Sequence, residues 1–67
     1  MQYDLFAQAT PDQIRDILDG KAEITSITHV FKGWHRITIE IEDLRQLRQI
    51  AATLRANGIK LAKSPNY

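Results

Sequence analysis

The chain has 67 residues, of which 43% are hydrophobic and 25% charged, and its formal net charge is +1. This length fits one domain, residues 1–67, and the composition is that of a globular chain rather than a disordered one. The sequence has no cysteine, which excludes disulfide scaffolds, zinc knuckles and thiol nucleophiles. It shows no apolar run of membrane-spanning length and no signal-peptide pattern, so we expect a cytoplasmic protein with no membrane partner.

The first two expected elements are a short strand and a helix. The strand covers residues 2–7, and Asp4 interrupts it. The helix covers about residues 11–19, because Thr10–Gln13 combines an N-capping threonine, a proline suited to the first helical position and a glutamine that completes a capping box. Gly20 ends the helix, since glycine adopts the left-handed conformation at low cost.

Two strands joined by a hairpin are expected next. Residues 35–42 alternate polar and apolar side chains, which places Ile37, Ile39 and Ile41 on one face. Residues 23–31 are rich in β-branched side chains, and Lys32–Trp34 between the two strands fits a hairpin loop.

The strand over residues 23–31 carries apolar side chains on both faces. Strict alternation places Ile24 and Val30 on one face, and Ile27 and Phe31 on the other. Either a β-bulge shifts the alternation, or both faces of the sheet are covered, the second by a partner or another copy of the chain. The sequence leaves both alternatives open.

A second helix is the most clearly marked element. It begins after Asp43, which forms a cap-and-return pair with Gln46, and it ends at Asn57-Gly58. An apolar stripe along this helix is wide enough to lie on a sheet, and three arginines share the flank beside it. The stripe consists of Leu44, Leu47, Ile50, Ala51 and Leu54, and the arginines are Arg45, Arg48 and Arg55.

A short final strand over residues 59–62 completes the order β-α-β-β-α-β, and the tail 64–67 is expected to fray. This order predicts a compact α+β fold of the ferredoxin-like type, with two helices on one face of a four-stranded antiparallel sheet. The alternative is α-β-β-α with irregular termini. Because many unrelated functions share the ferredoxin-like fold, the fold alone carries little functional information.

Few residues suggest catalysis. His29 and His35 flank the hairpin and can approach each other across it, but two imidazoles without a third ligand make a poor metal site. Glu40 and Glu42 project from one strand face about 7 Å apart, an arrangement that general acid–base catalysis also uses, but a solvated strand face accounts for them. We therefore expect a protein that is not an enzyme and that uses no cofactor and no metal.

The sequence favours a domain that acts through protein–protein interaction. The core of so short a chain is small, so a protein partner or a homo-oligomer would add burial. The candidate partner-binding residues are Phe31, Trp34 and Arg36 around the hairpin, since interface hot spots are enriched in Trp, Tyr and Arg. An adaptor, an oligomerisation module and an inhibitor of a host factor all fit this expectation.

The alternative function is nucleic-acid binding. Residues 1–43 carry eight acidic and four basic residues, whereas residues 44–67 carry five basic residues and no acidic one. Such an asymmetry provides a basic surface, although the near-neutral overall charge argues against strong phosphate binding. The candidate nucleic-acid-binding residues are Lys32, Arg45, Arg48, Arg55, Lys60 and Lys63.

Residues 32–39 resemble the central ribonucleoprotein strand of the RNA-recognition motif, a family that has the same order of elements. The basic residue, glycine and aromatic of Lys32–Trp34 fit that pattern. His35 stands where the family has a small residue, and Arg36 and Ile39 stand where it has aromatics. The resemblance implies RNA binding by base stacking on the sheet face, and the stacking aromatics that this mechanism uses are missing at these positions.

Overall fold

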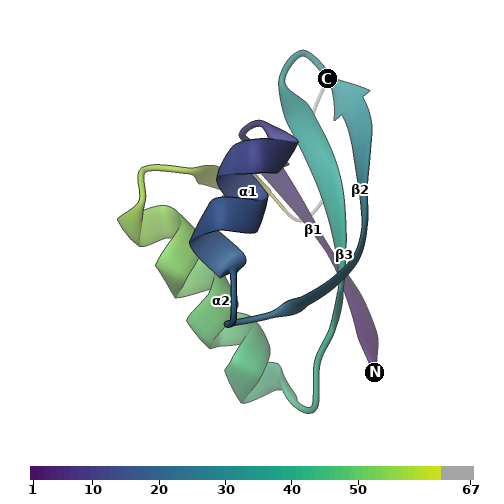
Figure 1. Ribbon diagram of the computed structural model, residues 1–67, viewed down its shortest axis with the longest axis vertical. Helices are drawn as coiled ribbons and strands as arrows, with labels where there is room; N and C mark the ends of the chain where they lie inside the picture. Colours follow the sequence, from purple (N-terminus) through teal and green to yellow (C-terminus); the bar gives the residue numbers. More distant parts are fainter. Residues whose placement is uncertain (63–67) are drawn as a thin grey trace.

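The computed structural model describes residues 1–62 and contains one four-stranded antiparallel sheet and two helices (Figure 1). The strand order is β2-β3-β1-β4, and both helices lie on the same side of the sheet. The expected tail and the candidate residue Lys63 lie outside the described residues. The elements are β1 (Gln2–Gln8), α1 (Pro11–Leu18), β2 (Glu23–Phe31), β3 (Trp34–Glu40), α2 (Leu44–Ala56) and β4 (Lys60–Ala62).

The alternative α-β-β-α order is wrong, because both terminal segments form strands. β1 lies inside the sheet, where it pairs with β3 over its full length and with β4 over Phe6–Gln8. Asp4 does not interrupt β1, since its side chain points away from the helices and accepts a hydrogen bond from Thr38 Oγ1 at 2.8 Å.

Helix α1 begins as the capping signals predict. Thr10 is the N-cap, and its Oγ1 accepts a hydrogen bond from the Gln13 backbone N–H at 3.2 Å. In return, the Thr10 backbone N–H donates to Gln13 Oε1 at 3.0 Å, which completes the capping box. After the helix, Gly20 has a φ of +71°, the left-handed conformation expected there. Ile14 and Leu18 point into the core.

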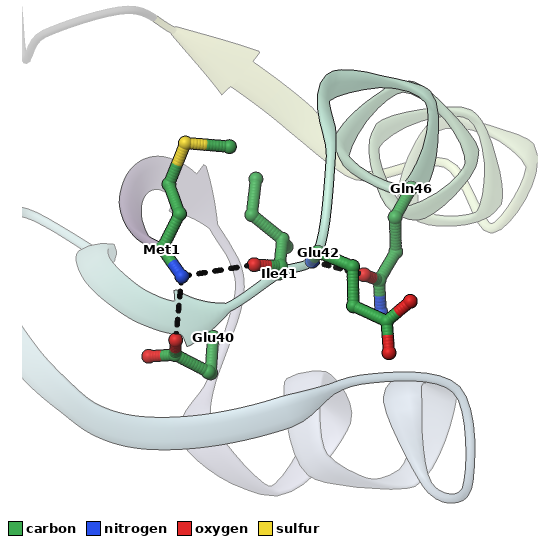
Figure 2. Close-up of polar contacts among 5 residues, drawn as sticks. All are labelled: Met1, Glu40, Ile41, Glu42 and Gln46. Carbon is green, nitrogen blue, oxygen red and sulfur yellow. Dashed lines mark hydrogen bonds and ion pairs between the residues drawn. The ribbon is translucent and has the colours of Figure 1, made fainter.

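Helix α2 also starts at the predicted residue, with one difference in its capping contacts. The Asp43 carboxylate accepts a hydrogen bond from the Gln46 backbone N–H at 3.0 Å, as expected for an N-cap. The Gln46 side chain, however, accepts from the backbone N–H of Glu42 at 2.8 Å rather than from that of Asp43 (Figure 2). The Gln46 side chain therefore holds the backbone of Glu42, the residue before the N-cap, rather than that of the N-cap itself.

The apolar stripe of α2 is narrower than predicted. Ile50 and Leu54 are buried and Leu47 is half-buried, but Leu44 is 54% exposed, so the expectation that it lies on the sheet with the rest of the stripe is wrong. At 100° per residue, Leu44 lies roughly 80–120° around the helix from the two buried residues. It therefore shares a flank with Arg48 rather than facing the sheet.

Strand β2 contains two register shifts that resolve the ambiguity in its pattern. Ile24 lies opposite Ile39 and Ile27 opposite Ile37, so one extra residue, Thr25, separates two side chains that share the helix-covered face. The bulge alternative is therefore confirmed, and the assignment of Ile24 and Ile27 to opposite faces is wrong.

The β2–β3 hairpin turn is shorter than expected. It contains only Lys32 and Gly33, whose φ angles are +35° and +83°, and Trp34 is the first residue of β3 rather than part of the loop. Positive φ at both central residues is what a two-residue turn of type I′ requires, because this geometry matches the twist of the strands.

Strand β3 ends at Glu40, two residues earlier than predicted, and polar contacts continue its pairing beyond that point. The Ile41 backbone N–H donates to the Met1 carbonyl at 2.7 Å. The Met1 ammonium donates to Glu40 Oε1 at 2.7 Å and to the Ile41 carbonyl at 3.1 Å (Figure 2). Ile41 is buried although it follows the strand.

The core lies between the sheet and the two helices. It receives side chains from both helices, from β1 and β3, and from the segments that follow β3 and α2. No helix in residues 1–62 has the length and apolar character needed to cross a membrane. The buried core residues are Ala7, Ile14, Leu18, Ile37, Ile39, Ile41, Ile50, Leu54 and Ile59.

Candidate functional site

The three candidate partner-binding residues lie together on the helix-free face of the sheet. Trp34 and Arg36 alternate with the buried Ile37 along β3, so their side chains point away from the helices. Phe31 lies opposite Trp34 in the ladder between β2 and β3. Its place on this face depends on the second register shift in β2, in which Val30 is the extra residue.

The register of β1 adds a fourth residue that the sequence pattern did not single out. Phe6 lies directly opposite Arg36 and is half-buried on the same face. Phe6, Phe31, Trp34 and Arg36 therefore form one surface, which we name the hairpin patch. Phe31 is 38% exposed, Arg36 is exposed, and Trp34 is half-buried.

Basic side chains surround the hairpin patch. Lys32 Nζ lies 5.5 Å from the centre of the Phe31 ring, within the range of a cation–π contact. Lys60 of β4 pairs with Gln8, which in turn lies opposite Trp34, so Lys60 extends the same face. Within residues 1–62, no ion pair involves any of these basic side chains. The patch is therefore apolar at its centre and cationic at its margin.

The opposite end of the helix-free face is acidic. Asp4 and Glu40 lie on this face toward the far end of β1 and β3, and Glu23 lies opposite Glu40 on β2. Asp4 is held there by the Thr38 hydroxyl, and Glu40 by the Met1 ammonium. The face is thus divided into an aromatic, basic half near the hairpin and an acidic half away from it.

The structure separates the predicted nucleic-acid-binding residues into two groups. Lys32 and Lys60 belong to the helix-free face, whereas the three arginines lie on α2, on the other side of the sheet. Arg48 and Arg55 line a groove beside β1, and Arg45 lines a different groove with Glu42.

The two histidines meet as expected. His29 and His35 are paired across the hairpin, and their rings lie edge to face with centroids 5.3 Å apart. The His35 Nδ1 atom is buried and makes no hydrogen bond. No group of three or more potential metal-ligating side chains occurs in the part of the chain that the structure describes.

The paired carboxylates do not form the arrangement expected from strand geometry. Glu42 follows the end of β3, so it does not share a strand face with Glu40. Both line an open groove of about 860 Å³, in which Glu40 contacts the Met1 ammonium and Glu42 lies near the start of α2 (Figure 2).

No family model, curated protein or solved structure matches the chain. Comparison with known proteins therefore assigns no function to these surfaces. Functional inference therefore depends on the surfaces themselves.

Proposed function

We propose that this chain is a small, non-enzymatic, cytoplasmic binding domain that acts by contacting a protein partner with its hairpin patch. The observation that carries the proposal is the clustering of Phe6, Phe31, Trp34 and Arg36 on the helix-free face. Aromatic and arginine side chains contribute most of the energy at protein interfaces, because they combine large apolar area with directed polar contacts. An adaptor, an oligomerisation module and an inhibitor of a host factor are the roles this surface suits.

We also assign the chain to the ferredoxin-like type. The antiparallel strand order β2-β3-β1-β4 and the position of both helices on one side of the sheet support this assignment. In such an architecture the helices cover one face, and the other face is available to a partner.

The charge around the hairpin patch defines the partner's chemistry. Lys32, Arg36 and Lys60 surround the aromatic side chains. A complementary partner presents an apolar centre with acidic residues at its margin, since opposite charges at the rim speed association and exclude wrong partners.

The test is capture of partners from an extract of the source cells with immobilised protein, quantified by mass spectrometry. The double variant Trp34→Ala/Arg36→Ala removes two patch residues. The matched control Leu44→Ala/Arg45→Ala removes an exposed apolar residue and an arginine from α2. We expect the patch variant to retain about tenfold less of a specific partner, and the control to retain it like the wild type.

Thermal unfolding of both variants completes the test. A patch variant that unfolds cooperatively but loses the partner supports a binding role for the patch. A patch variant that captures the same proteins in the same amounts contradicts the proposal.

A second candidate function is binding of single-stranded nucleic acid on the same face. The observation that favours it is the position of Lys32, Arg36 and Lys60 around three aromatic rings, since nucleic-acid platforms combine stacking surfaces with cations. The acidic half of the face and the net charge of +1 weigh against it. Titration of an oligonucleotide with tryptophan fluorescence, at low and high salt, tests it: binding that neither quenches Trp34 nor weakens with salt excludes this mechanism.

A further inference from the structure

Strand β2 forms one edge of the sheet, and within residues 1–62 it pairs only with β3 (Figure 1). A segment placed on the outer side of β2 lies four strand spacings, about 19 Å, from β4 at the other edge. The five residues that follow Ala62 in this sequence span at most about 18 Å when fully extended, so they are too few to pair along β2.

The regular part of this edge lies between the two register shifts of β2. Ser26–His29 pairs with β3 residue by residue, with no extra residue between them. This stretch presents about 13 Å of extended backbone, in which every second residue directs its N–H and C=O groups outward. Such groups are a template for another strand, whereas bulges blunt an edge where they occur. Added pairing is therefore confined to Ser26–His29.

Apolar side chains beside this edge are incompletely covered. Ile24 and Ile27 are half-buried, and both line an open groove of about 320 Å³ between β2 and the end of α1. A strand placed outside β2 would cover the remaining surface of these side chains. The added burial matters in so short a chain, because its own core is small.

The charges of the helix-free face define the orientation of the added strand. β2 runs from the acidic half of this face, where Glu23 lies opposite Glu40, to the basic half, where Lys32 follows its last residue. Neither Glu23 nor Lys32 has an ion pair within the described residues. A second copy placed antiparallel beside β2 brings the acidic half of each copy against the basic half of the other. The edge is thus complementary in charge to itself.

We propose that two copies of this chain form a symmetric dimer by antiparallel pairing of their β2 strands. A twofold axis within Ser26–His29 joins the two four-stranded sheets into one, with the helices of both copies on the same side. Main-chain hydrogen bonds supply affinity, and the charges favour a second copy over an unrelated extended segment. The proposal uses the sheet edge and is independent of the function proposed for the hairpin patch.

Sedimentation velocity of the full-length chain, from about 10 to 500 µM, tests the proposal, and we expect the mass to rise from one chain to two. Thr28 lies opposite Arg36 and is exposed on the helix-free face, close to its own copy across the twofold axis. Thr28→Glu and Thr28→Lys therefore each place like charges side by side. Each should raise the dissociation constant of the dimer at least about tenfold.

Mixing the two variants provides the decisive measurement. Thr28→Glu and Thr28→Lys in equal amounts should form a heterodimer, because the charges at the axis are then opposite. Gln49→Glu and Gln49→Lys, exposed on α2, are the matched control pair and should dimerise like the wild type. Trp34→Ala should also dimerise, which separates the β2 edge from the hairpin patch. Circular dichroism checks that each variant is folded.

Amide hydrogen exchange of the wild type gives a readout that needs no variant. Outward-directed amides of Ser26–His29 should exchange more slowly as the protein concentration rises, because dimerisation pairs them. Exchange that does not change with concentration contradicts the proposal.

Three further results overturn the proposal. A wild type that stays a monomer over the whole concentration range excludes the dimer. A dimer that both Thr28 variants keep forms through another surface. Loss of the dimer in Trp34→Ala, with no loss in the Thr28 variants, assigns it to the hairpin patch instead. Capture of a different protein by the hairpin patch can succeed or fail whatever the oligomeric state, so the two proposals are tested separately.

Discussion

Trp34 and Ile37 lie on the same strand and point to opposite faces of the sheet, so truncating each shows which face the fold depends on. Ile37 has no exposed surface and packs in the core, whereas Trp34 is half-buried on the helix-free face. If the hairpin patch is a binding surface, Trp34→Ala should weaken a partner's binding and leave most of the stability in place.

The two expected losses of stability differ in size. Removing a buried isoleucine side chain leaves a cavity and costs about 2–5 kcal/mol. For a chain of 67 residues, the free energy of unfolding is about 3–10 kcal/mol, so Ile37→Ala removes a large part of it. Trp34 contributes mainly through cross-strand contacts with Phe31 and Gln8, and Trp34→Ala is expected to cost about 1 kcal/mol.

Thermal unfolding followed by circular dichroism measures this difference. A loss of 1 kcal/mol lowers the melting temperature of so small a domain by about 4–8 °C. We therefore expect Trp34→Ala to melt about 4–8 °C lower and Ile37→Ala to melt more than about 8 °C lower, if it folds. Equal losses for the two variants would refute the reasoning, because Trp34 would then be as structural as the core.

Two further substitutions and one deletion test the local structure by thermal or chemical unfolding. Thr10→Ala removes the α1 cap and should cost about 1 kcal/mol; an unchanged stability would mean that the capping box does not form in solution. Lys32→Asn should stabilise the chain by about 0.5–1 kcal/mol, because asparagine tolerates the φ of +35° better, and a loss would contradict the turn geometry. Deletion of Thr25 should leave cooperative unfolding in place, because Ile24 and Ile27 are then two residues apart and both stay on the helix-covered face, and loss of the folded state would argue against the bulge.

Both helices could be predicted from the sequence because their signals are local. The capping contacts of α1 join Thr10 to Gln13, and that of α2 joins Asp43 to Gln46, only three residues apart in each case. The stop at Gly20 is equally local, since it depends on the conformation of a single residue.

The candidate site could be predicted only in part, because its geometry depends on pairing between distant segments. Phe6 joins the hairpin patch through its register with Arg36, which is thirty residues away in sequence. The sequence around Phe6 contains no periodic pattern that indicates its pairing with Arg36. The same limit applies to the groove that Arg48 and Arg55 of α2 form with β1, because these elements are far apart in sequence.

The second bulge of β2 links the fold to the proposed function. If the alternation of Ile27 and His29 continued without a register shift, Phe31 would point to the helix-covered side. The bulge turns it to the helix-free face, where 38% of it stays exposed beside Trp34. Burying a phenylalanine fully contributes about 1.5–3 kcal/mol, so this placement forgoes part of that stabilisation in a domain with a small core. A partner that covers the hairpin patch would recover it, so under the proposed function the bulge serves the binding surface rather than the core.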